Sequence, residues 1–180
     1  MNHIIYEALC ACLGLQPSSE EAAVLFRQSY GDPEPPPRAP RNTDAVYWSL
    51  SPDPYAPEPP PGYSAENAAG SSHDAAVSSF SAWTLQVVCY GPHALVNARK
   101  IRAFLFVDGA GMPRYILRKA GIRPVPDPPE PMLLHEPEGS LWRERADLTV
   151  SLRAGEKETH PARQNAIHTA PAVIIHSGGI

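Results

Sequence analysis

Cysteine is scarce in this 180-residue chain, and the three cysteines have no spacing that suggests a shared role. Cys10, Cys12 and Cys89 are odd in number and form no closed disulfide framework, which favours a reducing compartment. Cys10 and Cys12 stand two residues apart on an expected helix, which places them on different faces. We therefore expect this pair to pack in the core and not to chelate a metal.

Long apolar runs are also missing. No segment approaches the roughly 20 apolar residues that cross a bilayer as a helix. The apolar N-terminus, Met1 to Leu15, has no Lys or Arg ahead of it and contains Glu7, which argues for a packed helix and against an export signal. A net charge of −4 gives no general affinity for nucleic acid or for an anionic membrane. The sequence thus predicts a soluble protein with no membrane partner.

The motifs of common catalytic sites are absent as well. The chain has no Gly-x-Ser-x-Gly, no Gly-Lys-Ser/Thr phosphate loop, no His-Glu-x-x-His and no Cys-x-x-Cys, and its seven histidines are far apart. Ser72-His73-Asp74 is a contiguous run, whereas the residues of a catalytic triad converge from separate parts of a fold. We expect no catalytic residue, no metal site, no cofactor and hence no enzyme.

Proline is the residue in excess. The chain has 22 prolines, and half of them fall between Tyr30 and Tyr63. Because each proline fixes its φ angle and removes a backbone donor, no helix or sheet interior accommodates this density. We expect one domain, residues 1–180, with extended Pro/Gly/Ser-rich loops over 31–43 and 52–78. The remaining parts are an ordered core of about 1–30, 44–51 and 79–154 and a C-terminal arm, 155–180.

Hydrophobic periodicity predicts the ordered elements. Spacings of three and four indicate a helix from Ile4 to Gly14, and Ala22 to Tyr30 fits a short helix or a strand, of which we favour the strand. The other expected elements are strands over 44–50 and 82–90, helices over 93–107 and 112–120, an antiparallel strand with one wet face over 142–154, and a short strand or arm over 172–175.

Basic residues are concentrated in one stretch. Between Arg99 and Arg123 there are seven of them and one acidic residue, Asp108, a balance of +6, so the rest of the chain carries −10. Three interpretations are open: a nucleic-acid surface, although only Phe104 and Tyr115 supply nearby aromatics; a complementary subunit interface; or a solvated helix face. The candidate interface residues are Arg99, Lys100, Arg102, Arg114, Arg118, Lys119 and Arg123, opposed in a neighbouring subunit by Glu130, Glu136 and Glu138.

Four segments carry a family resemblance. They are Val87-Val88-Cys89-Tyr90-Gly91-Pro92, the helical run His93 to Arg102, Gly121-Ile122, and Trp142-Arg143-Glu144-Arg145-Ala146-Asp147-Leu148. In this order they resemble the neck or tail-terminator proteins of tailed bacteriophages. The resemblance covers roughly Phe80 to Arg153, together with the N-terminal helix. The proline-rich region from Tyr30 to Tyr63 and the Ala/Ser/Gly loop after it are longer than the family pattern.

The resemblance implies an α+β fold. Its core is a twisted, mostly antiparallel or mixed sheet of about four to five strands with helices packed on one face, to which this chain adds long Pro-rich loops and an extended C-terminal arm. It further implies a homohexameric ring that caps the tail tube and docks to head-completion or connector proteins, with DNA only passing through the lumen. The protein would then belong to the virion neck and assemble in the host cytoplasm.

The function that we expect is therefore structural, a tail terminator at the head–tail junction. A head-completion or adaptor subunit of the same neck is the nearer alternative, distinguished by binding portal protein and not tail tube. A nucleic-acid-associated accessory protein using residues 99–123 is the alternative from another class. Salt-dependent DNA binding that is lost on Arg99→Ala with Arg102→Ala would favour it.

The Pro-rich stretches generate the first prediction. If Tyr30 to Tyr63 and Pro124 to Pro137 are stiff connections that neighbours cover, limited proteolysis will cut them in the isolated subunit and spare them in the assembly. Equal cleavage rates in the two states would make them linkers outside any interface.

Overall fold

The computed structural model describes residues 1–29, 39–56, 62–66, 74–107, 113–127 and 129–161. The helices are α1 (Asn2–Cys12), α2 (Glu20–Leu25), α3 (Ala94–Phe106) and α4 (Pro113–Lys119). The strands are β1 (Phe26–Gln28), β2 (Ala45–Pro52), β3 (Gly62–Glu66), β4 (Asp74–Tyr90), β5 (Ile122–Pro124), β6 (Met132–Glu138) and β7 (Leu141–Pro161). Elements predicted over 44–50, 82–90, 93–107, 112–120 and 142–154 are all present.

Two long strands form the spine of the sheet. All 17 residues of β4 pair with β7 in antiparallel register, from Tyr90 opposite Arg145 to Asp74 opposite Pro161. At the usual rise per residue the ladder is about 55 Å long. β2 and β3 follow one another along the free edge of β4, β5 and β6 share the free edge of β7, and β1 pairs in parallel with β2.

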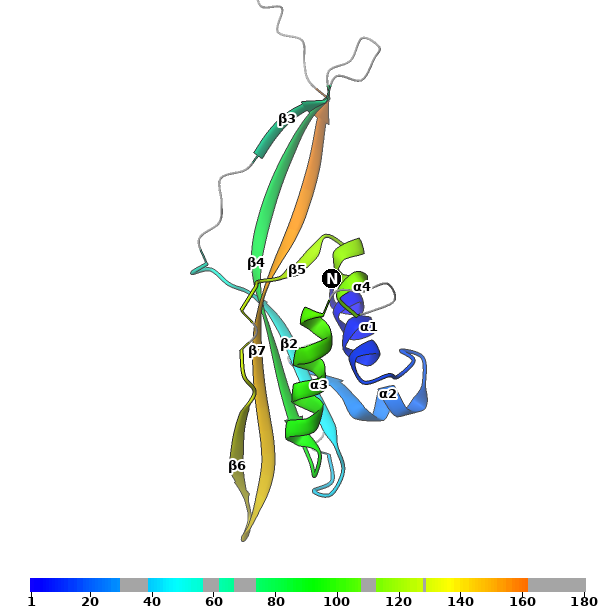
Figure 1. Cartoon of the computed structure of the whole chain (residues 1–180), viewed down its shortest axis with the longest axis vertical. Coiled ribbons are helices and arrows are strands. Elements are labelled where there is room, and N and C mark those ends of the chain that lie inside the picture. The colour runs from blue at the N-terminus through cyan, green and yellow to red at the C-terminus, as the bar shows by residue number, and fades with distance from the viewer. Residues whose placement is uncertain (30–38, 57–61, 67–73, 108–112, 128, 162–180) are drawn as a thin grey trace, which may run out of the picture.

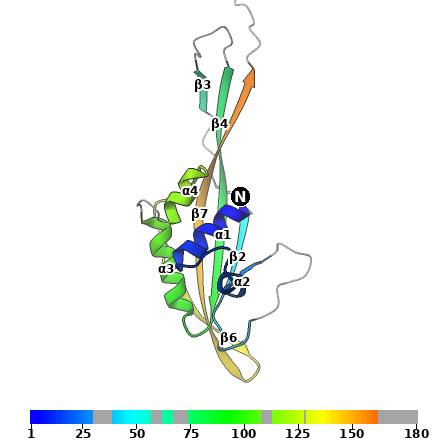
Figure 2. The same ribbon diagram turned by 90° about the vertical axis from the view of Figure 1, so that its right-hand side faces the viewer.

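The four helices of the described residues all lie on one face of this sheet, against its middle part (Figure 1, and the view turned by 90° in Figure 2). β3 and the adjoining ends of β4 and β7 extend beyond the helices at one end, and the β6–β7 hairpin extends at the other. The α+β class with helices on one face is thus confirmed. The described strands number seven, where four to five were expected.

The core lies between the helices and the alternate residues of β4 and β7. Leu85, Val87 and Cys89 of β4 are fully buried, and the intervening residues face the other side of the sheet. The same alternation on β7 confirms the predicted half-wet strand, because Ala146, Leu148, Val150 and Leu152 are buried. The helices complete the core with Ile5 and Leu9 of α1, Ala98, Ile101 and Leu105 of α3, and Leu117 of α4.

The cysteines belong to this core, as expected. All three are free thiols, and Cys10, Cys12 and Cys89 are each at most 2% exposed. Burial raises the pKa of the Cys89 thiol to about 12. Of the helices that the structure describes, none combines the length and the apolar character needed to cross a bilayer.

The segment after the first helix differs from the favoured prediction. Residues 22–30 were expected to form a strand, but α2 occupies Glu20–Leu25 and the strand is confined to Phe26–Gln28. The reason is local, because the Ser19 hydroxyl accepts a hydrogen bond from the Ala22 backbone N–H and so caps a helix of good helix formers. Phe26 then buries its ring and begins the pairing with β2.

Two ranges expected to lack strands contain them. Within 52–78 the structure places β3 and the first residues of β4, and β7 continues past residue 154 to Pro161, into the expected arm. Backbone pairing accounts for this, because the first residues of β4 pair with the last residues of β7 on one side and with β3 on the other. β6 includes Pro137, which an edge strand tolerates. Residues 30–38 and 162–180, including 172–175, lie outside the described residues.

The turn from β4 into α3 depends on Gly91. Its φ angle is +104°, a value that side-chain-bearing residues rarely adopt. A Cβ atom at this position would stand 2.6 Å from Asp44 Oδ1 and 2.8 Å from the Thr43 carbonyl oxygen. Asp44 in turn accepts hydrogen bonds from the His93 backbone N–H at 3.0 Å and pairs with the His93 ring at 2.8 Å. The start of β2 and the start of α3 therefore meet at the Cα atom of Gly91.

This contact predicts a large cost for Gly91→Ala. The unfavourable φ and the clash with Thr43 and Asp44 together should lower the free energy of unfolding by about 3 kcal/mol. Gly139→Ala is the matched control, because Gly139 also has a positive φ (+66°) but nothing lies within 4 Å of the added Cβ.

Gly139→Ala should lower the free energy of unfolding by only about 1 kcal/mol, because only the positive φ angle opposes the added Cβ atom. Urea denaturation of the two variants measures the difference. Equal losses would contradict a tight contact between Gly91 and residues 43–44.

Candidate functional site

The described side chains do not converge on a reactive centre. Three of the seven histidines have described side chains, and they lie on separate elements: His3 on α1 beside Glu7, His93 before α3 beside Asp44, and His135 on β6. Within the described ranges no group of three or more His, Cys, Asp or Glu residues is placed to hold a metal ion. The charged surfaces are therefore the candidates for function.

The basic residues predicted as an interface spread over α3, α4 and β5. Arg99 and Lys100 are exposed on α3, and Arg123 is exposed on β5. Arg114 is half-buried and donates a hydrogen bond of 2.8 Å to the Phe106 carbonyl oxygen, which ties α4 to the end of α3. Arg102 forms an ion pair with Glu130 at 3.1 Å. Five of the seven predicted basic residues thus remain exposed, namely Arg99, Lys100, Arg118, Lys119 and Arg123.

An aromatic ring lies in the middle of the α4 part of this surface. Tyr115 is 37% exposed, and its ring has the Arg118 guanidinium 5.4 Å and the Lys119 ammonium 5.8 Å from its centroid. Spacings of three and four residues place all three side chains on one side of the helix. We call Tyr115, Arg118 and Lys119 the α4 knob.

The three predicted acidic residues already face basic groups of their own chain. Glu130 pairs with Arg102, Glu136 lies 3.6 Å from Arg145, and Glu138 lies 3.9 Å from Arg143. The β6–β7 register explains the last two pairs, because Glu136 stands opposite Arg143 and next to Arg145, and Glu138 stands two residues further along the same face. The structure therefore does not bring these carboxylates to the basic helix surface, apart from Glu130.

The β6–β7 pairs are part of a cluster around Tyr90 that sequence reasoning missed. The Tyr90 hydroxyl donates a hydrogen bond of 2.8 Å to Glu136 Oε2, and the Arg143 guanidinium lies 4.5 Å from the Tyr90 ring centroid. Arg143 is only 5% exposed, an unusual position for an arginine. Burial and the hydrogen bond to Glu136 raise the pKa of Tyr90, and the hydrogen bonds to Asp147 raise the pKa of Arg145. The sequence signal that could have revealed this cluster is the alternation of charged residues along β6 and along the start of β7.

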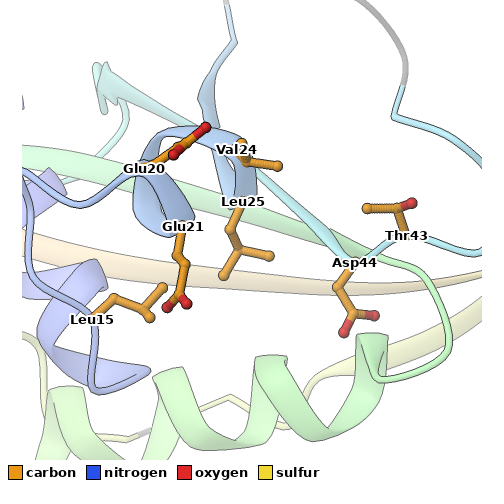
Figure 3. A pocket seen from close by; sticks show the side chains of 7 residues that line it. All are labelled: Leu15, Glu20, Glu21, Val24, Leu25, Thr43 and Asp44. Atoms are coloured by element: carbon orange, nitrogen blue, oxygen red, sulfur yellow. The ribbon is translucent and has the colours of Figure 1, made fainter.

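A hollow lies on the opposite side of the helical layer from α4. It has a volume of about 520 Å³ and is bordered by α2, by Leu15 in the connection that follows α1, and by the residues just before β2 (Figure 3). Leu15, Glu21 and Leu25 converge on one side of it, and Asp44 extends from the other wall. The complete lining is Leu15, Glu20, Glu21, Val24, Leu25, Thr43 and Asp44. We call this the α2 hollow.

The α2 hollow combines apolar walls with acidic groups. Val24 is 52% exposed, a large value for an aliphatic side chain, and Leu15 and Leu25 are partly exposed. Glu20 and Glu21 are both exposed. Sequence reasoning missed the hollow because it favours a strand over 22–30. A strand separates the two glutamates from the apolar residues that helical spacing brings beside them.

The α4 knob and the α2 hollow belong to opposite edges of the sheet. α2 leads directly into β1, which ends the strand order on one side, and α4 leads into β5, which ends it on the other. Figure 2 shows α4 and α2 on opposite sides of α1. The cations of the α4 knob therefore lie at one lateral margin of the molecule, and the exposed glutamates of α2 lie at the other.

Comparison with known proteins supplies a family. The model of the phage neck terminator protein family matches residues 2–179, almost the entire chain. This match confirms the resemblance deduced from residues 87–148. No curated protein sequence matches the chain significantly.

The Tyr90 cluster yields a stability prediction. Tyr90→Phe removes the hydroxyl that donates to Glu136 but keeps the ring beside Arg143, so the free energy of unfolding should fall by about 1.5 kcal/mol. Tyr55→Phe is the matched control, because Tyr55 is 94% exposed, and its effect should stay within about 0.5 kcal/mol. Urea titration of both variants provides the comparison, and an unchanged midpoint for Tyr90→Phe would show that the hydrogen bond contributes nothing.

Proposed function

This chain belongs to the phage neck terminator protein family, a family of structural proteins of the phage neck, and we propose that it is the tail terminator of the head–tail junction. Six copies form a ring that caps the tail tube and joins it to head-completion proteins. The ring assembles in the host cytoplasm and remains in the neck of the virion, where DNA passes through its lumen.

The observation that carries this proposal is the separation of charge onto two lateral surfaces. In a closed ring each subunit meets its two neighbours through two different surfaces of the same chain. The basic residues of α3, α4 and β5 lie on one side of the subunit, and the exposed glutamates of α2 lie on the other. Complementary surfaces of this kind orient subunits head to tail and disfavour other arrangements.

The helix-free face of the sheet supports a role as the channel wall. Ser49, Gln86 and Thr149 form one row across β2, β4 and β7, and Ser51, Thr84 and Ser151 form the next row. These rows hold hydroxyl and amide groups without a formal charge. Charged residues flank these rows on the same face of β7, with Asp147 on one side and Arg153 on the other, so the middle of the face is uncharged and charges of both signs lie beyond it.

Electron microscopy together with native mass spectrometry tests the proposal. The purified protein, alone or with tail tube protein, should form closed rings of six copies that seat on the ends of tubes. A monodisperse monomer that forms no ring even with tube protein present would exclude the terminator function.

The same samples separate the alternatives. Rings that bind portal protein and leave tube ends bare would indicate the head-completion subunit instead. Salt-dependent binding of duplex DNA by the monomer, lost on Arg99→Ala with Arg102→Ala, would indicate the nucleic-acid-associated accessory protein.

A further inference from the structure

We propose that the α4 knob of one copy inserts into the α2 hollow of the next copy, and that this contact closes the ring. The inference rests on the proposed ring and names the two surfaces that would make it. Tyr115 occupies the apolar part of the hollow, and Arg118 and Lys119 meet the carboxylates of Glu20 and Glu21.

The α4 knob has the composition of an interface anchor. Tyrosine and arginine are the residue types that most often dominate binding energies at interfaces, and an aromatic ring loses little conformational freedom on insertion. The Tyr115 ring already has a cation on it from Arg118 and another from Lys119, at 5.4 and 5.8 Å. The three side chains therefore form one surface, with an aromatic centre and a charge of +2.

The α2 hollow is complementary to the α4 knob in its apolar lining and in its negative charge. Its apolar lining includes Val24, which is 52% exposed in the single chain, and burying such a side chain stabilises a contact. Glu20 and Glu21 bring a charge of −2 to α2, and no described residue forms an ion pair with either. The hollow is open to solvent, and a volume of about 520 Å³ is large enough to receive a tyrosine ring.

The acidic residues first predicted as the acceptor fit this role less well. Glu136 and Glu138 lie on the β6–β7 hairpin beside Arg145 and Arg143, and Glu130 pairs with Arg102. Using them in a neighbour's interface would cost these contacts. Glu20 and Glu21 form no ion pair with another described residue, and they lie at the opposite edge of the sheet from α4.

The geometry also sets the inclination of the subunit. α4 lies toward the β3 end of the long axis, and α2 lies toward the β6 end (Figure 1). Surfaces that meet around a rotation axis must stand at the same height along it. The β4–β7 ladder is therefore inclined to the ring axis, in the same sense that strands are inclined in closed barrels.

Charge reversal tests the contact on the full-length protein. Glu20→Arg with Glu21→Arg makes both lateral surfaces basic, and Arg118→Glu with Lys119→Glu makes both acidic. Each variant alone should assemble at least about tenfold more weakly than the wild type, because like charges then face each other. Circular dichroism verifies that each variant folds, and Glu144→Arg, a reversal at an exposed position near the start of β7, is the control that should leave assembly unchanged.

Mixing the two reversed variants distinguishes a lost contact from a misfolded subunit. In an equimolar mixture every basic hollow meets an acidic knob and every acidic hollow meets a basic knob, so rings of alternating subunits should form. Native mass spectrometry would show three copies of each. Rings restored by mixing support the proposed contact, and a mixture that stays unassembled overturns it.

A neutral substitution tests the apolar part. Tyr115→Ala should weaken assembly at least about tenfold, whereas Trp142→Ala, at a position of β7 that is 64% exposed, should have no effect. The wild type is measured in parallel. If the wild type forms no rings, the proposed function fails; if wild type and all variants form rings equally well, the function stands and the knob-into-hollow contact is wrong.

Discussion

The antiparallel ladder between β4 and β7 is the constraint on which the rest of the structure depends. Its 17 consecutive pairs join segments that are more than fifty residues apart in the sequence, and every other strand except β1 pairs directly with one of the two. Because antiparallel register fixes which side chains share a face, the ladder decides at once which residues meet the helices and which remain wet. A shift of the β4–β7 register by one residue would turn the residues that now face the helices toward solvent, and the solvent-facing residues toward the helices.

The ladder also determines where the charges lie. Only its middle part is covered by helices, and the elements at the lateral margins, α2 with β1 and α4 with β5, are placed by the strands that they adjoin. The cations of the α4 knob thereby come to one margin, and the exposed glutamates of α2 come to the other. This separation suits a subunit that repeats around a ring, since each copy offers its neighbour the surface that the neighbour lacks.

Much of the covered part of the fold was predictable from local patterns. The alternation over 82–90 and 142–154 and the helical spacing over 4–14 and 93–107 identify elements whose local preference agrees with their tertiary role. The sequence was a poor guide where pairing alone makes the structure. β3, the first residues of β4 and the last of β7 have no pattern of their own, and their strands follow from the partner edge beside them.

The sequence predicted the basic side of the candidate site but not the surface that would receive it. The basic residues were visible as a run, but their partners were sought among Glu130, Glu136 and Glu138, which the fold pairs within the chain. The α2 hollow depends on the Ser19 cap, which makes a helix of residues that also fit a strand. Proximity in space between Leu15, α2 and residues 43–44 has no counterpart in the sequence, so only the folded chain reveals it.

The central claim is that neighbouring copies meet knob into hollow, and zero-length cross-linking of assembled rings tests it most directly. Rings made from an equal mixture of ¹⁵N-labelled and unlabelled protein are treated with a carbodiimide, which joins a lysine amine to a carboxylate in contact with it. The account predicts peptides that join Lys119 to Glu20 or Glu21, with half of them pairing a labelled and an unlabelled chain. Intact rings in which Lys119 of one copy is joined only to carboxylates other than these two would contradict it.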